Sequence, residues 1–143
     1  ALLFLDIDGF KPVNDAYGHQ VGDLVLVAIA QRLREAVRDV DTVARLGGDE
    51  FLILLNDTEL PLEAAERVAQ ESIRVLAEPI LIDDLNIRIG VSIGIASCYG
   101  AEAEVMTVHR LVSQADNAMY QAKADGRNRY VAHDGDLPPP LLQ

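Results

Sequence analysis

Cysteine and tryptophan are nearly absent from this chain of 143 residues, which holds one cysteine and no tryptophan. A single thiol cannot form an internal disulfide, so the fold must be held together by its apolar core. The scarcity of cysteine is also typical of a reducing cytoplasm, and we expect a cytoplasmic domain. Cys98 is best explained as a small core or strand residue rather than as a reactive thiol.

Basic residues are also few: 12 lysines and arginines stand against 23 aspartates and glutamates, and the net charge is −11. This balance argues against nucleic acid as a partner, because binding to a duplex normally requires a basic face. It does not exclude a nucleotide substrate, since metal ions can neutralise carboxylates locally.

Apolar runs long enough to cross a membrane are missing, although half of the residues are hydrophobic. The length suits one domain with a substantial core, which we place at residues 1–133. The chain lacks an initiator methionine and begins inside an apolar stretch, so we expect a longer parent protein, for which a membrane anchor stays open. Residues 134–143, with three successive prolines, are predicted to be a stiff linker or tail.

Hydrophobic periodicity predicts alternating strands and helices with a hairpin in the middle. The expected strands are 1–8, 42–46, 51–55, 80–82, 86–97 and 129–132, and the expected helices are a short turn before Gly18, then 22–38, 61–77 and 107–124. The hairpin favours an α+β fold (an α/β sandwich), with a mixed, largely antiparallel sheet flanked by helices, over a doubly wound parallel sheet. One face of strand 86–97 carries small residues, which usually permits close approach of a helix or a ligand.

Two pairs of carboxylates stand at the ends of predicted strands. Asp6 and Asp8 alternate along the first strand and share one face, while Asp49 and Glu50 follow the Gly47–Gly48 turn of the hairpin. If the first strand neighbours the hairpin, these acids converge with a repulsion of about 1–4 kcal/mol per pair. Mg²⁺ would relieve the repulsion, because it prefers carboxylate and phosphate oxygens. The alternative is that Asp8 caps the following helical turn and that Asp49 and Glu50 are solvated turn residues.

Further motifs accompany these acids in a fixed order over nearly the whole chain. They are Leu5-Asp6-Ile7-Asp8-Gly9-Phe10-Lys11-Pro12-Val13-Asn14-Asp15, Tyr17-Gly18-His19, Gly22-Asp23, Arg45-Leu46-Gly47-Gly48-Asp49-Glu50-Phe51, Val91-Ser92-Ile93-Gly94, Ala115-Asp116, Met119-Tyr120, Ala122-Lys123 and Gly126-Arg127-Asn128. In this succession the chain resembles the GGDEF family of diguanylate cyclases, whose signature alone would be weak evidence. The helix and arm that precede the first strand in that family are missing here.

The resemblance implies a domain similar to the palm of nucleotidyl cyclases and polymerases. Members of the family condense two GTP molecules into cyclic di-GMP with release of pyrophosphate, using one GTP on each of two domains. A second GGDEF domain is therefore an expected partner, and the isolated fragment is expected to be inactive if two half-sites cannot meet. Sensory domains and an EAL phosphodiesterase domain are further expected partners. The segment Gly9-Phe10-Lys11-Pro12 resembles the same segment of GGDEF domains that are fused to EAL domains.

Carried over residue by residue, the resemblance implies that Asp6, the Ile7 carbonyl and Asp49 bind Mg²⁺, with two ions expected per half-site. These are hard oxygen ligands of the right kind. We favour Asp49, assisted by the metal, as the group that helps to deprotonate the attacking 3′-hydroxyl, and Glu50 is the other candidate. Lys11 is counted with them as a catalytic residue that neutralises the triphosphate.

The resemblance also implies a substrate-binding set. It consists of Asn14, His19, Asp23, Lys123 and Arg127. Asn14 and Asp23 would recognise guanine, because a carboxylate accepts from N1–H and the amino group while an asparagine can donate to O6. By themselves these two would be explained as a turn residue and a helix N-terminal acid. His19 would lie near the ribose or base, or simply pack in a loop, and the two cations would bind phosphate or suit a helix C-terminus.

The segment before the hairpin carries a possible regulatory motif, Arg38-Asp39-Val40-Asp41. It resembles the family's RxxD inhibitory site, where cyclic di-GMP binds and stops the enzyme, with Arg45 as a further candidate. Arginine can stack on guanine and bond it in bidentate fashion, while aspartate accepts from its amino edge. RxxD alone is common and usually means solvated charges at the end of a helix.

A different class of function also fits the sequence. The domain could be a non-catalytic module that senses GTP or cyclic di-GMP and regulates an adjacent domain such as an EAL phosphodiesterase. Retention of Asp6, Asp49 and Glu50 argues against this alternative, because a pure sensor does not need metal ligands.

Overall fold

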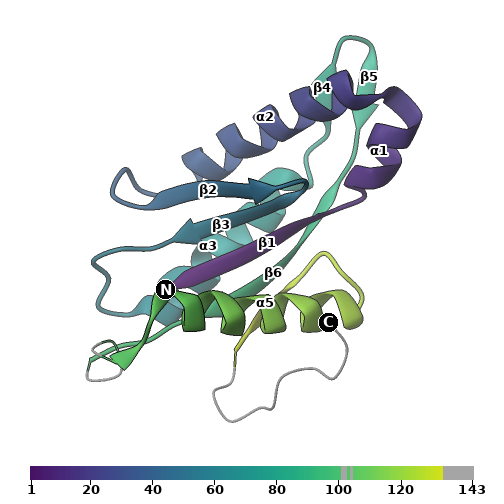
Figure 1. Ribbon diagram of the computed structural model, residues 1–143. Coiled ribbons are helices and arrows are strands. Elements are labelled where there is room, and N and C mark those ends of the chain that lie inside the picture. The colour runs from purple at the N-terminus through teal and green to yellow at the C-terminus, as the bar shows by residue number, and fades with distance from the viewer. Residues whose placement is uncertain (101–102, 104, 134–143) are drawn as a thin grey trace.

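A five-stranded sheet with helices on both faces forms the domain in a computed structural model that describes residues 1–100, 103 and 105–133 (Figure 1). Along the chain the elements are β1 (Leu2–Asp8), α1 (Phe10–Tyr17), α2 (His19–Glu35), β2 (Thr42–Gly47), β3 (Glu50–Leu54), α3 (Pro61–Leu76), β4 (Ile80–Ile82), β5 (Leu85–Ile87), β6 (Gly90–Ala96), α5 (Val108–Ala124) and β7 (Tyr130–Ala132). Among the described residues, no helix is both long and apolar enough to cross a membrane. The predicted linker at 134–143 lies outside the described residues.

The strands of the main sheet are ordered β2-β3-β1-β6-β7. β1 lies at the centre and pairs antiparallel with both β3 and β6, and β2 pairs antiparallel with β3. Only the pairing of β6 with β7 at the other edge is parallel. The predicted α+β class with a mixed, largely antiparallel sheet is therefore confirmed.

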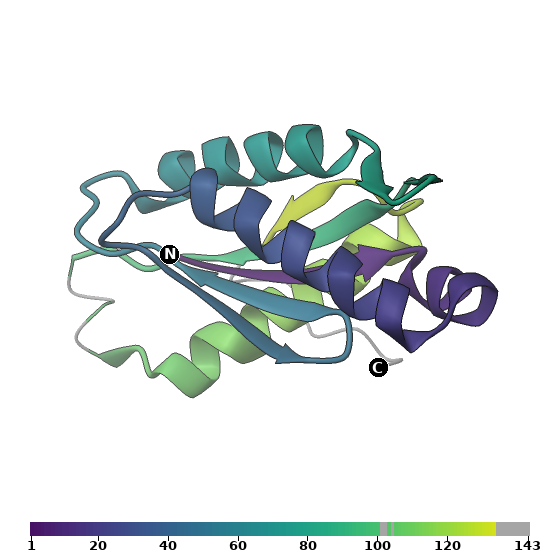
Figure 2. The ribbon, with the colours of Figure 1, turned by 90° about the horizontal axis from the view of Figure 1, so that it is seen from above.

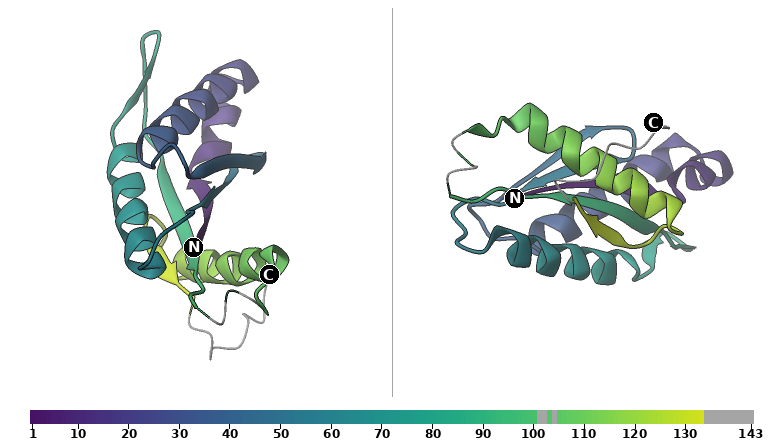
Figure 3. Two further views of the ribbon diagram at one scale, coloured as in Figure 1. Left: turned by 90° about the vertical axis from the view of Figure 1, so that its left-hand side faces the viewer. Right: turned by 90° about the horizontal axis from the view of Figure 1, so that it is seen from below.

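Each face of the sheet is covered by helices, with α2 and α3 on one face and α5 on the other (Figures 2 and 3). Leu3, Leu5 and Ile7 of β1 belong to the larger core cluster, beneath α2 and α3. Leu2 and Phe4 belong to the smaller cluster, beneath α5. Side chains alternate between the two faces of a strand. Asp6 and Asp8 therefore lie on the same face as Leu2 and Phe4, which is the face covered by α5.

Two predicted elements have bounds that differ from those in the structure by more than one residue. The expected strand 86–97 is broken at residues 88–89: its first part is β5, which pairs with β4 in a separate two-stranded sheet, and β6 begins at Gly90. This hairpin stands beyond the main sheet, beside α2 (Figure 1). Alternating hydrophobicity cannot reveal where a chain changes its pairing partner. The expected helix 22–38 begins earlier, directly after Gly18, and ends at Glu35.

The small-residue face of β6 receives a helix, as predicted. An added Cβ on Gly94 would lie 1.9 Å from the main-chain oxygen of Ala115 in α5. The glycine therefore lets the α5 backbone approach the sheet directly.

The hydroxyl of Ser72 is buried in α3 without a hydrogen-bond partner. We expect Ser72→Ala to raise the free energy of unfolding by about 1–2 kcal/mol, because a buried unsatisfied group is costly and alanine also favours helix. Urea denaturation would measure the change, with Ser113→Ala at an exposed position of α5 as the control for helix propensity alone. An equal gain in the two variants would contradict the argument from burial.

Candidate active site

The acidic residues of the first strand and of the hairpin tip lie side by side. Asp6 stands opposite Glu50 in the antiparallel pairing of β1 with β3. The N–H of Ile7 donates to the main-chain oxygen of Asp49 at 3.0 Å. The predicted convergence of Asp6 with Asp49 and Glu50 is therefore confirmed, and it follows from a register that places the hairpin tip beside the end of β1.

Burial and repulsion act on these carboxyl groups. Desolvation is the main cause that raises the pKa of Asp6, and the charges of Asp49 and Asp8 raise it further, while a hydrogen bond from Lys123 opposes them. The pKa of Glu50 is raised by burial and then by Asp6 and Asp49. The site therefore holds negative charge at an energetic cost that a cation would offset.

Asp116 of α5 belongs to the same cluster, although its sequence position alone suggested no role. Burial raises the pKa of Asp116, while Lys123 lowers it, and the charge of Asp116 contributes to the raised pKa of Glu50. Asp116 and Lys123 are two helical turns apart and share one face of α5. That spacing is the signal that could have identified Asp116.

The α5 helix delivers a cation to the carboxylates. Nζ of Lys123 lies 2.5 Å from Oδ2 of Asp6, with both side chains largely shielded from solvent. Lys123 follows Leu111, Ala115 and Met119 at helical spacing, and those three pack in the smaller core cluster. The packing of this apolar stripe thus places the ammonium group beside β1.

Asp8 does not cap the helix that follows it, so that alternative is wrong. The N-cap of α1 is Gly9, in the left-handed conformation with φ 86°, and no side chain caps this helix. The carboxylate of Asp8 instead accepts hydrogen bonds from the hydroxyl of Ser92 and the main-chain N–H of Asn128. Nε of Arg127 lies 3.9 Å from it.

The donor set suits a hard divalent cation. In the described part of the chain, no three side chains of His, Cys, Asp or Glu are grouped so that they could hold a metal ion. The predicted set of Asp6, the Ile7 carbonyl and Asp49 needs only two carboxylates, and Mg²⁺ commonly takes its other ligands from water and phosphate. Burial raises the pKa of Asp6 and of Glu50, and the neighbouring carboxylates raise both further; this repulsion is the observation that favours such an ion.

The candidate guanine-binding residues lie on α1 and α2. Oδ1 of Asn14 is buried and has no hydrogen-bond partner. It lies against Gly22, where an added Cβ would come within 1.8 Å of it. Asp23 is exposed in the second turn of α2, which begins at His19 and has no acid in its first turn, so the helix-dipole explanation of Asp23 loses its basis. Lys11 and His19 are exposed.

Arg38 and Asp41 are bonded to each other. Nε and Nη2 of Arg38 lie 3.1 and 2.9 Å from the two carboxylate oxygens of Asp41. The same carboxylate accepts from the N–H groups of Arg38 and Asn56, and it is buried. The N–H of Asp41 donates to the Arg38 carbonyl, which closes the loop between α2 and β2. The two residues of the predicted inhibitory site therefore lie together, and the carboxylate of Asp41 accepts hydrogen bonds from the protein itself.

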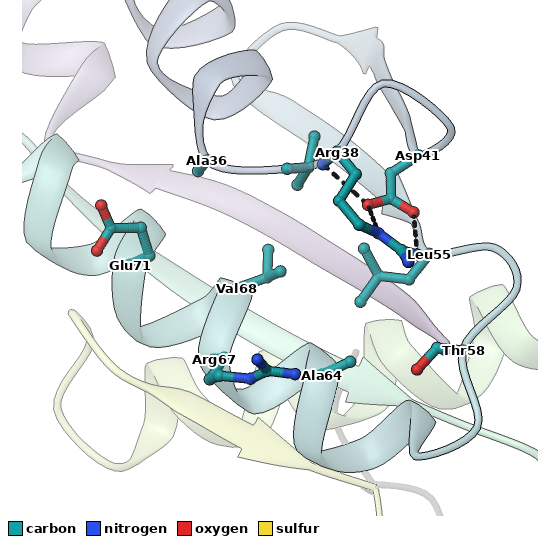
Figure 4. A pocket seen from close by; sticks show the side chains of 10 residues that line it. Ala36, Arg38, Asp41, Leu55, Thr58, Ala64, Arg67, Val68 and Glu71 are labelled. Atoms are coloured by element: carbon teal, nitrogen blue, oxygen red, sulfur yellow. Dashed lines mark hydrogen bonds and ion pairs between the residues drawn. The ribbon is translucent and has the colours of Figure 1, made fainter.

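A pocket of about 660 Å³ opens beside this pair (Figure 4). Its walls come from the loop between α2 and β2, the segment after β3, and residues 64–71 of α3. Arg38 and Asp41 line one side, and Arg67 and Glu71 of α3 line the other. The pocket combines apolar groups with a few charged ones, as ligand-binding pockets commonly do.

The buried carboxylate of Asp41 leads to a pH-dependent prediction. Burial alone would raise its pKa, but hydrogen bonds from Arg38 and from the N–H of Asn56 outweigh burial and hold the pKa below the ordinary 3.8. The free energy that the ionised Asp41 contributes to folding is therefore fully present when the pH is above the ordinary pKa of an aspartate. It is lost as the pH falls through the lowered pKa of the folded state. We expect Asp41→Asn to lose about 1–3 kcal/mol at pH 7, with the difference shrinking below about pH 4. Urea denaturation from pH 7 to 3 measures this, and a constant difference would contradict it.

Comparison with known proteins identifies the family. The sequence matches the family described as diguanylate cyclase, GGDEF domain, over residues 1–129. It is 49% identical over 137 residues to the bifunctional diguanylate cyclase/cyclic di-GMP phosphodiesterase MucR of Pseudomonas aeruginosa, covering 96% of this chain and 19% of that protein. The chain spans 19% of the length of MucR and 36% of the length of diguanylate cyclase A of Treponema denticola.

Solved structures agree in fold. An EAL/GGDEF domain protein from M. capsulatus is similar with a TM-score of 0.82 and 49% identity, covering 93% of this chain and 83% of that one. The GGDEF domain of DgcB from Caulobacter crescentus in complex with c-di-GMP is similar with a TM-score of 0.71 and 30% identity, covering 92% and 75%. The chain belongs to the GGDEF domain family of diguanylate cyclases.

Proposed function

We propose that this domain condenses two GTP molecules into cyclic di-GMP and pyrophosphate, with one GTP held by each of two facing domains. The observation that carries the proposal is the meeting of Asp6, Asp49 and Glu50 at one end of the sheet, with Lys123 against them. Family membership and the cyclase activity in the name of MucR support it.

Within the site, Asp6, the Ile7 carbonyl and Asp49 would hold Mg²⁺, two ions per half-site. When bound, Mg²⁺ supplies a positive charge that favours both an attacking alkoxide and a leaving pyrophosphate. The residues of the chain keep this charge in place and accept the proton of the 3′-hydroxyl. Asp49 and Glu50 both remain candidates for that step, and the raised pKa of Glu50 supports its capacity to accept a proton.

The substrate would lie between the carboxylates and the α1–α2 corner. Asn14 and Asp23 would bind the base and His19 would lie near the sugar. Oδ1 of Asn14 is packed against Gly22, and we assign its other amide atom, the donor, to guanine O6.

The phosphates would be bound by cations from two elements, Lys11 of α1 and the pair Lys123 and Arg127 at the end of α5. A domain with one such set binds one GTP, so that the reaction needs a second domain to present the other.

The test is a synthesis assay in which a leucine zipper fused to the chain holds two copies together. With GTP and Mg²⁺ we expect cyclic di-GMP in the chromatogram, and little product from the unfused chain. A folded, dimeric, GTP-binding fusion without product would contradict the proposed activity.

Product inhibition is proposed at the pocket beside Arg38 and Asp41. The side chain of Arg38 is 54% exposed while that of Asp41 is 2% exposed, so we assign the first contact with cyclic di-GMP to Arg38, with Arg67 on the opposite wall. The DgcB domain in complex with c-di-GMP supports a product site on such domains. In the fusion, Arg38→Ala should raise the half-inhibitory product concentration about ten-fold or more. An unchanged value would remove the assignment.

A sensory role is the second candidate, favoured by the EAL/GGDEF organisation of a structural neighbour. In that case the domain would bind GTP or cyclic di-GMP and regulate an attached phosphodiesterase domain in a longer, cytoplasmic or membrane-anchored protein. Binding of nucleotide by calorimetry, without any synthesis by the fusion, would favour this role over catalysis.

A further inference from the structure

The carboxylate of Asp8 is held by donors of the protein itself. It is only 12% exposed, and the hydroxyl of Ser92 lies 2.9 Å from each of its oxygens. The main-chain N–H of Asn128 donates to Oδ2 at 3.0 Å. Ser92 is itself completely buried, so this hydroxyl cannot turn to solvent. Asp8 thus links the ends of β1 and β6 to the segment that follows α5.

That segment has a backbone that needs support from the rest of the fold. After α5, the N–H of Gly126 bonds to the carbonyl of Lys123 and the N–H of Arg127 to that of Ala122, which is the glycine-containing termination known as the Schellman motif. Gly126, Arg127 and Asn128 then have positive φ angles of 123°, 65° and 50°. Two of the three carry side chains, for which this conformation is uncommon and must be held by contacts elsewhere.

Asn128 supplies further contacts of this kind. Its Oδ1 accepts from the N–H of Val91 at 3.4 Å. The same side chain lies over Gly90, where an added Cβ would come within 2.9 Å of Oδ1. Together with the bond from its N–H to Asp8, these contacts attach the turn to β1 and β6.

The turn in question carries Arg127, one of the proposed phosphate ligands. Its Nε lies 3.9 Å from Asp8, and its side chain is 62% exposed. Asp6, on the same face of β1, also lies beside a cation, at the shorter distance of 2.5 Å from Nζ of Lys123. Asp6 and Asp8 are neighbours on one face of β1, and each lies beside one cation. These cations are Lys123, in the last turn of α5, and Arg127, just after it.

We propose that Asp8 is a positioning residue: with Ser92 it fixes the turn at 126–128, so that the guanidinium of Arg127 faces the phosphates of the bound nucleotide. This inference rests on the proposed function. The hydroxyl of Ser92 and the N–H of Asn128 already bond the Asp8 carboxylate, and the assignment gives Asp8 a role other than that of a metal ligand.

The proposal predicts a change in affinity with an unexpected sign. Removing a negative charge beside a bound triphosphate should, by electrostatics alone, tighten binding. If Asp8 positions Arg127, Asp8→Asn should instead weaken the binding of Mg²⁺–GTP by the unmodified chain about ten-fold, while GMP, which lacks the outer phosphates, changes less than about two-fold. Ser92→Ala should act in the same direction, although Ser92 reaches no ligand.

Calorimetry on five variants tests this, after circular dichroism has shown that each is folded. Asp125→Asn is the matched control, because it removes the same charge at the exposed C-cap of α5, directly before the turn. It should change the affinity for GTP by less than about two-fold in either direction. In an Arg127→Ala background, Asp8→Asn should have no further effect, since the group that it positions is gone.

An equal loss from Asp8→Asn with and without Arg127 would overturn the inference. It would also be overturned if Asp8→Asn raised the Mg²⁺ concentration needed for GTP binding while Ser92→Ala did not, as expected of a metal ligand. If the wild-type chain binds GTP and the Asp8→Asn variant binds it with the same affinity, this inference is overturned and the proposed function is not. Absence of GTP binding by the wild-type chain overturns the proposed function and the inference together.

Discussion

Gly94→Ala should unfold a large fraction of the domain. An alanine Cβ at this position in β6 would lie 1.9 Å from the main-chain oxygen of Ala115, 2.2 Å from the nitrogen of Met119 and 2.9 Å from the carbonyl carbon of Ala118. All three atoms belong to the backbone of α5, so no side-chain rotation can make room. The helix would have to move away from the sheet, and we expect a loss of about 3 kcal/mol or more.

The measurement is urea denaturation followed by circular dichroism, in which the midpoint should fall sharply. Ala44→Val enlarges a side chain at an exposed position of β2 and should change stability by less than about 0.5 kcal/mol. A Gly94→Ala midpoint equal to that of the wild type would show that the helix can be displaced at no cost. Displacement of α5 would also separate Lys123 from Asp6, so any folded remainder should bind GTP weakly.

Asp49→Asn is expected to reduce cyclic di-GMP synthesis by the zipper fusion by about 10²–10³-fold, because it removes a proposed metal ligand from the centre of the cluster. Stability should change in the opposite direction or not at all. The charge of Asp49 raises the pKa of both Asp6 and Glu50, so its removal relieves repulsion in the folded state.

Chromatographic rates and urea midpoints, both measured on the fusion, separate the two effects. Glu59→Gln removes a charge from an exposed loop outside the site and should alter neither quantity. Loss of synthesis that tracks a loss of stability would contradict a direct role for Asp49. The variant Glu50→Gln tests whether Glu50 accepts the proton of the 3′-hydroxyl. If it does, the rate of wild-type synthesis should fall as the pH drops through the raised pKa of Glu50, and this pH dependence should be absent from Glu50→Gln.

The sequence alone determined those features that depend on neighbours along the chain. The Gly47–Gly48 turn predicted the hairpin, and the alternation of Asp6 with Asp8 placed both on one face of a strand. The apolar stripe from Val108 to Ala122 predicted α5. Each of these follows from a period of two or of 3.6 residues, or from the backbone freedom of a glycine, and so requires no knowledge of what lies across the fold.

Tertiary structure decided the rest, because it concerns contacts between segments that are far apart in sequence. The partner of Asp8 is a hydroxyl on β6, 84 residues away, and not the adjacent helix. Asp116 joins the carboxylates only because α5 packs across β1, and Asp41 is closed off by Asn56 from the loop after β3. Such contacts depend on strand order and register, and a local pattern of residue types leaves both open.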